Sequence, residues 1–294
     1  MHVCVTGSNS FIGRAFLQYC DSNQIKVTGI DLVPNDRRDC FVGDITKDEI
    51  VELIPENVDA IVHLAALSKD PDCRGRAKQC FDSNVMATLR LMDIAESKNC
   101  KQFVFASSEW VYSHYLEDAS VTEETLIDIS KHKSEYALSK LVSEANLRQR
   151  SLQGFCDVTI LRFGIVYGPR PGNWCALESL MNQSATQDIV SVGSASTARQ
   201  FIHVDDVARG IGASLGHPGF EVFNIQGESL VTLRDVVETS ASLFGRTVKL
   251  QETNPDYPSI RTVSGAKANE KLGFKPEISL QEGIRSVALF LGLM

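Results

Sequence analysis

The feature that most constrains the fold is an alternation of short apolar segments and longer amphipathic ones over the first 168 residues. The stretch 2–6 is apolar and rich in β-branched residues, which is typical of a strand. Glycine-rich punctuation follows, and then Phe11, Ile12, Ala15 and Phe16 recur at helical spacing. Repetition of this strand, turn and helix predicts a parallel sheet with helices on both faces.

Further segments continue the alternation. "VDAIVHLAA" is a continuous apolar run, as expected for a strand covered on both faces. The expected strands lie at 25–31, 39–44, 58–66, 101–108 and 157–168, and the expected long helices at 77–97 and 134–149. The sequence therefore predicts an α/β fold with a doubly wound parallel sheet of the Rossmann type.

After Gly168 the pattern loosens, and prolines mark loops. We expect residues 1–168 to form a dinucleotide-binding domain and residues 169–294 to be mainly a smaller, C-terminal substrate-binding region. The stretch 199–226 reads as helix and strands that rejoin the first domain. Within it, His203 is expected to be a structural strand residue, and Asp205 and Asp206 to begin a helix.

Composition excludes several classes of function. The formal net charge of -8 gives no electrostatic reason to expect binding to nucleic acid or to an anionic membrane. No apolar run reaches the ~18 residues of a membrane span. The eight cysteines form no CxxC pair and have no histidine at metal-like spacing, so we expect free thiols and no metal site. Because a strand begins at once, we expect no secretory signal and a cytoplasmic protein.

The segment "TGSNSFIG" indicates a dinucleotide-binding loop in which Gly7 and Gly13 hold the outer glycine positions. Ser10 stands in the middle, where a missing Cβ normally lets the backbone approach a pyrophosphate, and its hydroxyl could donate to a phosphate oxygen. Asp31 ends the next strand, at the ~20-residue distance expected for an acid that binds the adenosine ribose. Such an acid repels a 2′-phosphate and favours NAD over NADP, although Arg37 and Arg38 follow shortly and leave NADP open.

A second motif, "SEYALSK", places Tyr136 and Lys140 one turn apart on one face of a helix. An exposed helix pair is the alternative interpretation. A tyrosine base near neutrality needs its pKa lowered by roughly three units, about 4 kcal/mol, and a neighbouring ammonium supplies part of this. Ser107 and Ser108 end the fifth strand, at the sheet edge where such folds bind ligands. A hydroxyl, a tyrosinate and a nicotinamide there would move a hydride and a proton to or from a carbinol.

Taken in order, these motifs resemble the extended short-chain dehydrogenase/reductase family of nucleotide-sugar epimerases, dehydratases and reductases. The resemblance spans nearly the whole chain and rests on "TGSNSFIG", "GDI", "HLAA", Asn84, "SSEWVY", "YALSK", "LRFGIVYGPR" and "RQFIHVDDVA". It implies catalytic roles for Ser108, Tyr136 and Lys140, and contact of Lys140 with the nicotinamide ribose. The other cofactor contacts that we expect are Gly7, Ser10, Phe11, Ile12, Gly13, Asp31, Asp44 and Ile45 beside the adenine, Leu64, Ala65, Ala66 and Tyr136.

The resemblance also implies a homodimer, formed through the helix that contains Asn84 and the helix that contains Tyr136. Arg199 matches an arginine that contacts the nucleotide part of the substrate, and Arg261 is a poorer match for a second one. Paired guanidinium donors suit a diphosphate. Ser108 and Glu109, with His114 and Asn173, are candidates to line the sugar site.

Two departures bear on the reaction. Trp110 stands where similar dehydratases carry an acid, and the acid is Glu109 instead, which counts against elimination of water. Ile165 stands where many epimerases have an asparagine that touches the sugar nucleotide.

We therefore expect an NAD-dependent nucleotide-sugar 4-epimerase that works through a transient 4-keto sugar. The alternative is an NAD(P)H-dependent 4-keto-(6-deoxy)sugar nucleotide reductase, and a dehydratase is third. From a different class, a non-catalytic dinucleotide-binding protein is disfavoured because the serine, tyrosine and lysine are all present. Retention of NAD during purification separates the first two.

Overall fold

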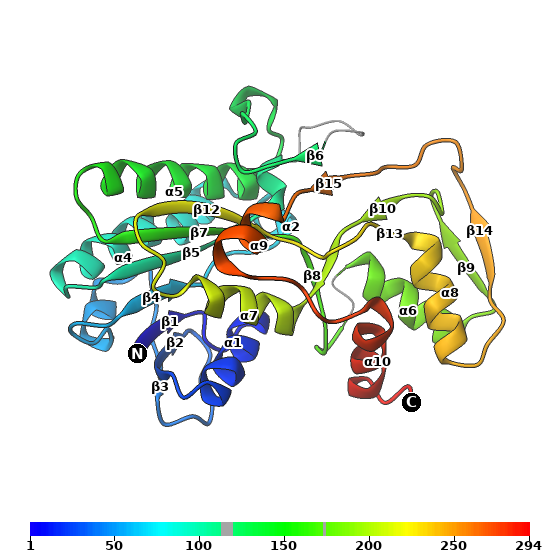
Figure 1. The fold of residues 1–294 in the computed structure, drawn as a ribbon, viewed down its shortest axis with the longest axis horizontal. Coiled ribbons are helices and arrows are strands. Elements are labelled where there is room, and N and C mark those ends of the chain that lie inside the picture. Colours follow the sequence, from blue (N-terminus) through cyan, green and yellow to red (C-terminus); the bar gives the residue numbers. More distant parts are fainter. Residues whose placement is uncertain (113–119, 173–174) are drawn as a thin grey trace. The chain divides into compact units, whose positions relative to one another are not determined.

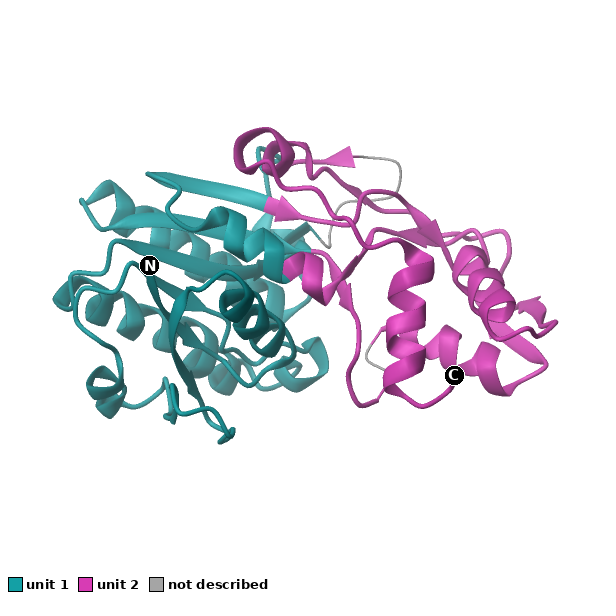
Figure 2. Cartoon of the chain, turned by 60° about the horizontal axis from the view of Figure 1, so that its bottom comes forward, with its two compact units in different colours: residues 1–114, 123–163, 208–223 teal, residues 115–122, 164–207, 224–294 magenta. Residues whose placement is uncertain are grey.

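The computed structural model describes residues 1–112, 120–172 and 175–294. The chain divides into two compact units, coloured separately in Figure 2. Unit 1 comprises residues 1–114, 123–163 and 208–223, and unit 2 comprises residues 115–122, 164–207 and 224–294. Among the described residues, no helix combines the length and apolar character that a membrane span requires.

Unit 1 is built on a seven-stranded sheet with the order β12-β7-β5-β4-β1-β2-β3. All seven residues of β5 are buried, which explains why an uninterrupted apolar strand forms there. The strands are β1 (His2–Thr6), β2 (Lys26–Asp31), β3 (Cys40–Val42), β4 (Ala60–His63), β5 (Gln102–Ser108), β7 (Asp157–Phe163) and β12 (Phe220–Ile225). The predicted doubly wound parallel sheet is confirmed, and its strand order reverses between β1 and β4, the point where such folds bind ligands.

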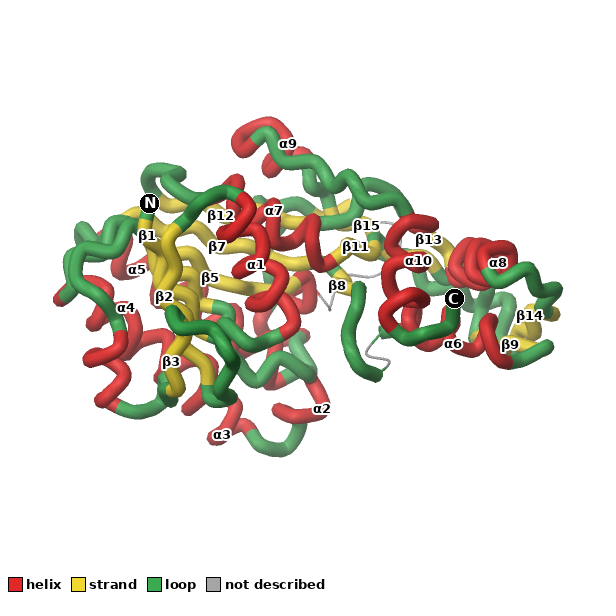
Figure 3. The backbone as a smooth tube through the Cα atoms, turned by 90° about the horizontal axis from the view of Figure 1, so that it is seen from below, coloured by secondary structure: helices red, strands yellow, loops and turns green. Residues whose placement is uncertain are grey.

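Helices cover both faces of this sheet. In Figures 1 and 3, α4 (Ala87–Ser97) and α5 (Glu135–Leu152) lie on one face, and α1 (Phe11–Ser22) lies on the other with α7 (Val204–Ser214), whose last seven residues belong to unit 1. The single helix expected over 77–97 is interrupted. It consists of α3 (Ala77–Phe81), a π-helical turn over Asp82–Met86, and α4. The small helix α2 (Asp70–Cys73) precedes it.

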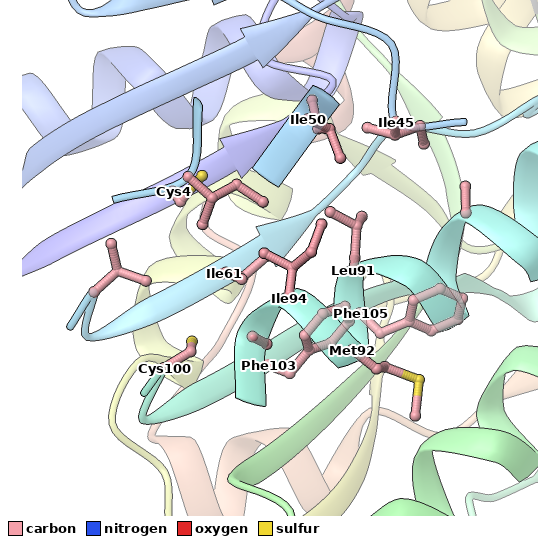
Figure 4. Close-up of a cluster of buried hydrophobic side chains, with 14 of the residues drawn as sticks. Cys4, Ile45, Ile50, Ile61, Leu91, Met92, Ile94, Cys100, Phe103 and Phe105 are labelled. Atoms are coloured by element: carbon pink, nitrogen blue, oxygen red, sulfur yellow. The ribbon is translucent and has the colours of Figure 1, made fainter. Parts of the chain in front are cut away.

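The main core of unit 1 lies between the sheet and α4, as Figure 4 shows. Leu91 and Met92 of α4 are buried against Ile61 of β4 and Phe103 and Phe105 of β5. Each such side chain contributes about 1.5–3 kcal/mol when it is fully buried. This packing fixes the strands whose carboxyl ends carry the predicted site.

Unit 2 contains four two-stranded sheets and a helical core. The pairs are β8 (Ile165–Tyr167) with β11 (Phe201–His203), β9 (Ile189–Val192) with β14 (Lys249–Glu252), β10 (Ala198–Arg199) with β13 (Val231–Thr232), and β6 (Ser120–Val121) with β15 (Thr262–Val263). The helices are α6 (Ala176–Thr186), α8 (Leu233–Leu243), α9 (Ala266–Leu272) and α10 (Leu280–Phe290). Apolar residues of α6, α8 and α10, among them Met181, Val236 and Ile284, share one buried cluster.

The strand expected over 157–168 is broken at Gly164 into β7 and β8. A Cβ at Gly164 would lie 2.3 Å from Oε1 of Gln226, so a larger residue there would require the Gln226 side chain to move. As predicted, His203 is a strand residue, and its Nε2 lies 3.0 Å from the Ser286 hydroxyl. Asp205 and Asp206 lie in the first turn of α7, which is also as predicted.

The chain passes from unit 1 to unit 2 after Phe163, and the stretch that returns to unit 1 is 208–223. These bounds are narrower than the predicted 1–168 and 199–226. The assignment of the dinucleotide to one part and the substrate to the other stays a prediction.

Candidate active site

The loop between β1 and α1 needs glycine at both outer positions. Gly7 has a φ of +73°, and a Cβ there would lie 2.6 Å from the backbone nitrogen of Ala65. A Cβ at Gly13 would lie 2.1 Å from the carbonyl oxygen of Gly7. The glycines therefore allow the loop, the start of α1 and the segment after β4 to approach one another closely.

Ser10, at the middle position, is the N-cap of α1. Its hydroxyl oxygen accepts a hydrogen bond from the backbone N–H of Gly13, at 3.1 Å. Phe11 and Ile12 form the first turn and are half-buried. The first turn of a helix presents free N–H groups and a positive dipole end, which suit an anion. Serine can thus stand in place of glycine without disrupting the loop, because its hydroxyl caps the N-terminus of α1.

Asp31, the last residue of β2, is held beside this loop. Its carboxylate accepts hydrogen bonds from the backbone N–H groups of Asn9, at 2.9 Å, and Val33, at 3.0 Å. Arg37 donates instead to the carboxylates of Asp21 and Asp39, over 2.6–3.0 Å. The positive charge of Arg37 is therefore already paired, and the carboxylate of Asp31 stands beside the glycine loop.

The other predicted cofactor residues follow the same edge of the sheet. The N–H of Gly43 donates to the carbonyl of Asp31, which places Asp44 next to the end of β2. The Asp44 carboxylate accepts from the Thr46 N–H and hydroxyl, at 2.8 and 2.7 Å. Ile45 is buried in the core, where Ala65 packs against the same cluster. The structure thus gathers residues 7–13, 31, 44–45 and 64–66 at the carboxyl ends of β1 to β4.

Ser108, Tyr136 and Lys140 come together at the end of β5. Ser108 is the last residue of β5, and Tyr136 lies in the first turn of α5, which the Ser134 hydroxyl caps. The Ser108 side chain lies near enough to Tyr136 to lower the pKa of its phenol. Nζ of Lys140 donates to the carbonyl of Ala106, at 2.8 Å, and lies 5.9 Å from the centre of the Tyr136 ring. The structure therefore brings the predicted trio together at the end of β5.

The protonation states differ from our expectation. Burial raises the pKa of Tyr136 to about 12, although the Ser108 side chain acts in the opposite direction. Burial also lowers the pKa of Lys140 to about 8. Burial is the largest influence on the pKa of Tyr136, because exclusion of water from the phenol disfavours its charged form. A pKa this high favours the protonated phenol at neutral pH.

Asn84 organises the segment after β4, a role that the sequence did not reveal. Its Oδ1 accepts from the N–H of Leu67, at 2.8 Å, and its Nδ2 donates to the Leu67 carbonyl and the Ser139 hydroxyl, both at 3.0 Å. Asn84 lies in the π-helical turn, a distortion that often marks functional sites. It therefore ties the loop after β4 to α5, the helix of Tyr136.

His63 of "HLAA" is buried and links β1 to the helical segment that contains Thr88 by hydrogen bonds. The Thr88 hydroxyl donates its proton to the carbonyl of Asn84, at 2.6 Å, so its oxygen accepts from Nε2–H of His63, at 3.1 Å. Nδ1 of His63 then accepts from the Thr6 hydroxyl, at 2.7 Å. Burial, with the charge of Lys140, lowers the pKa of His63 to about 3, so the ring is neutral.

Behind the trio lies a buried ion pair, which the sequence reading also missed. Glu144 of α5 pairs with Arg162 of β7 at 2.6 Å, and both side chains are less than a tenth exposed. The signal in the sequence is the spacing, because Glu144 follows Tyr136 and Lys140 at two successive intervals of four residues.

The predicted substrate residues fall in both units. In unit 1, Glu109 is buried in the short helical turn Glu109–Tyr112 directly after Ser108, and the Trp110 N–H donates to the Ser108 hydroxyl at 3.3 Å.

In unit 2, the Arg199 guanidinium donates to the carbonyls of Ala198 and Ser259 and to the Ser259 hydroxyl, over 2.6–2.8 Å. The N–H of Arg261 bonds to Ala198, so the two arginines lie on neighbouring segments. Roles of these residues in substrate binding stay predictions, and His114 and Asn173 lie outside the described residues.

Known proteins resemble this chain over its whole length. A UDP-glucose epimerase described as uncharacterized, YtcB of Bacillus subtilis (strain 168), is 27% identical and the match covers 99% of this chain and 98% of that protein. The UDP-glucuronate 4-epimerase of Thermodesulfobacterium geofontis (strain OPF15) is 26% identical, covering 82% of this chain and 76% of the relative. Other relatives are named as nucleotide-sugar dehydratases and reductases.

A solved structure, MoeE5 in complex with UDP-glucose and NAD, is 26% identical to this chain. It superposes with a TM-score of 0.84 and covers 99% of both chains. Residues 3–225 match the NAD dependent epimerase/dehydratase family. The glycine loop, Asp31 and the assembled trio all lie within that match, and the chain belongs to the NAD-dependent epimerase/dehydratase family.

Proposed function

We propose that this protein is an NAD-dependent nucleotide-sugar 4-epimerase, cytoplasmic and homodimeric. The observation that carries the proposal is the buried contact of Ser108, Tyr136 and Lys140 at the same sheet edge as Asp31. Because Asp31 is acidic and Arg37 is already paired, the ribose end of the site disfavours a 2′-phosphate. That favours NAD, the cofactor that an epimerase keeps and reuses, while the exposed Arg38 is the remaining cation that leaves NADP open.

The residues present fit this cofactor. The close approach at Gly7 and the first turn of α1 suit a pyrophosphate, and Asp31 suits the adenosine ribose hydroxyls. We propose Asp44 and Ile45 beside the adenine, residues 64–66 along the pyrophosphate and ribose, and Lys140 at the nicotinamide ribose. When bound, NAD supplies a hydride acceptor and donor.

We propose that residues of this chain carry out the proton transfer to and from the 4-hydroxyl of the sugar. In its ionised form, Tyr136 takes the proton of the 4-hydroxyl as that carbon is oxidised to a ketone, and returns it when the ketone is reduced on its opposite face. Because burial raises the pKa of Tyr136, the phenol must lose its own proton before this step. Ser108, which lies beside Tyr136, bonds the same oxygen and relays the proton. Lys140, whose Nζ lies 5.9 Å from the centre of the Tyr136 ring, is the nearby cation that would favour the ionised phenol, against the opposing effect of burial. We propose that Glu109 contacts the sugar and that Arg199 and Arg261 contact the nucleotide diphosphate.

The second candidate is an NAD(P)H-dependent reductase of 4-keto-(6-deoxy)sugar nucleotides, which uses the same three residues once per turnover. Ile165, in place of an asparagine common in epimerases, favours it, as do the relatives named as reductases. Trp110, which is 41% exposed, stands where a dehydratase carries its acid, so a dehydratase is disfavoured.

The first test is denaturing release of cofactor from freshly purified protein, followed by its identification and its ratio to protein chains. Near-stoichiometric NAD, with turnover on a panel of UDP-sugars, is the expected result. An empty protein that consumes NAD(P)H with 4-keto-6-deoxy sugar nucleotides would overturn the epimerase in favour of the reductase.

Different observations support the proposed homodimer and the proposed cytoplasmic location. The resemblance places a dimer interface on the helices of Asn84 and Tyr136, and light scattering on the purified protein should report twice the chain mass of 32.3 kDa. All eight cysteines are free, which suits a reducing compartment.

A further inference from the structure

Helix α5 directs three ionisable side chains toward the sheet at intervals of four residues: Tyr136, Lys140 and Glu144. The first two belong to the site of the proposed function. Glu144 has no part in that chemistry, yet it is 93% buried. A carboxylate is costly to bury unless other groups compensate its charge, so its partners indicate what it does.

Those partners come from two neighbouring strands. Oε1 of Glu144 accepts from the Ser107 hydroxyl of β5, at 2.5 Å, and from Nε of Arg162 of β7, at 3.1 Å. Oε2 accepts from Nη2 of Arg162, at 2.6 Å. Arg162 is held in turn by the Tyr112 hydroxyl, which accepts from its Nη1 at 2.6 Å. One acid therefore fastens α5 to β5 and β7.

The attachment on β5 lies directly beside the reacting groups. Ser107 precedes Ser108, the partner of Tyr136, and Lys140 donates to Ala106 on the other side. Residues 106–108 of β5 thus meet Lys140, Glu144 and Tyr136 in turn. A shift of α5 along the strand would break all three contacts together.

Glu144 also acts on Lys140 by its charge. Burial lowers the pKa of Lys140, and the Cys80 thiol, the Glu144 carboxylate and the Cys73 thiol oppose this effect. The titratable groups that face Lys140 are Tyr136 and Glu144 of α5, Cys73 of α2, Cys80 of α3 and His63 of β4. Glu144 is the one carboxylate among these five groups, and its fixed negative charge favours the ammonium form.

We propose that Glu144 is a positioning residue, whose carboxylate, held by Ser107 and Arg162, keeps α5 in register with β5 and keeps Lys140 charged beside Tyr136. This inference rests on the proposed function for the importance of Lys140. It concerns a residue outside the serine, tyrosine and lysine trio.

The test is an NMR titration of ¹³C-labelled lysine side chains in protein freed of cofactor and substrate, with the Lys140 signal assigned from Lys140→Arg. In the unsubstituted protein Lys140 should titrate near pH 8. Glu144→Gln should move this midpoint to lower pH, and Glu144→Asp should restore most of it. Asp93→Asn is the matched control, because it removes an exposed acid of α4 that pairs with Arg150 of α5, and it should leave the midpoint unchanged.

The proposal would be overturned if folded Glu144→Gln had a lower melting temperature but an unchanged Lys140 titration midpoint. Glu144 would then only stabilise the fold, through its ion pair with Arg162. If the single variant fails to fold, Glu144→Gln/Arg162→Gln leaves no buried charge unpaired and is judged by the same midpoint. The titration needs no substrate, so it stands apart from the proposed function. If Glu144→Gln shifts the Lys140 midpoint but the unsubstituted protein turns over no UDP-sugar, the proposed epimerase activity is wrong and the positioning role of Glu144 still holds.

Discussion

At the scale of single residues, the site shows how burial sets protonation. Tyr136 and Lys140 have pKa values displaced toward their neutral forms, to about 12 and about 8, because both are shielded from water. The sequence predicted which residues meet, since helical spacing and the end of a strand determine that. It could not predict these displacements, because burial depends on α2 and α3, which cover Tyr136 with Cys73 and Cys80.

Tyr136→Phe should abolish proton transfer while sparing NAD binding, because it removes one hydroxyl and keeps the ring. Loss of a positioned acid–base group costs about 10²–10⁴-fold in rate. We expect kcat to fall by that factor and the Kd for NAD, measured by calorimetry, to stay unchanged.

Tyr257→Phe makes the same chemical change at a tyrosine that is 76% exposed, and it should leave both quantities as they are. Unaltered turnover in Tyr136→Phe would contradict the mechanism.

His63 should make the protein sensitive to acid. Its pKa is about 3 in the folded chain and 6.5 when unfolded, so between these values only the unfolded chain binds the proton. The free energy of unfolding should therefore fall as pH drops below 6.5, by up to roughly 5 kcal/mol at pH 3. Urea unfolding between pH 7 and pH 4 should show a flatter slope for His63→Asn than for the unsubstituted protein. Equal slopes would show that His63 does not contribute.

At the scale of elements, local sequence determined where helices and strands form, and tertiary contacts determined where they break. The run 157–168 is mostly apolar and has no internal turn signal other than Gly164, yet it divides there into β7 and β8, and the Gln226 side chain lies beside the break. The periodic stretch 77–97 contains a π-helical turn that lets Asn84 reach Leu67 and Ser139. Neither partner is near in sequence, so no pattern within the element reveals the break.

Substitutions of Ser10 test whether its side chain stabilises the start of α1. Ser10→Ala removes the acceptor for the Gly13 N–H and should lower the free energy of unfolding by about 1 kcal/mol, whereas Ser10→Gly should cost only a few tenths. Urea denaturation without NAD measures both.

Ser279→Ala removes the N-cap of α10 in unit 2 and serves as the comparison. It should lower the free energy of unfolding by a similar amount. Equal losses for Ser10→Ala and Ser10→Gly would contradict a capping role.

At the scale of the whole molecule, the two units are interleaved along the chain. Unit 1 is completed only by residues 208–223, which include most of β12, the neighbour of β7 in the sheet. The alternation of elements predicted the parallel sheet. The pairings within unit 2 were not predictable, because its strands are two to four residues long and pair with distant segments.

A fragment of residues 1–168 should therefore fail to behave as a domain. Without β12, the edge of β7 would be unpaired, and six of its seven residues are buried in the intact protein. Such an apolar edge pairs with other chains. We expect this fragment to aggregate at concentrations where the full chain stays dispersed, as light scattering would show, and a monodisperse, folded fragment would contradict this.

The late return of β12 also matters while the protein is being made. β12 ends about 60 residues after β7, so at about 5–20 residues per second a ribosome needs about 3–12 s to deliver it. Throughout that interval the nascent sheet carries an open apolar edge. The order of the elements thus gives the growing chain a period of vulnerability, in which a chaperone would protect β7 until its partner strand emerges.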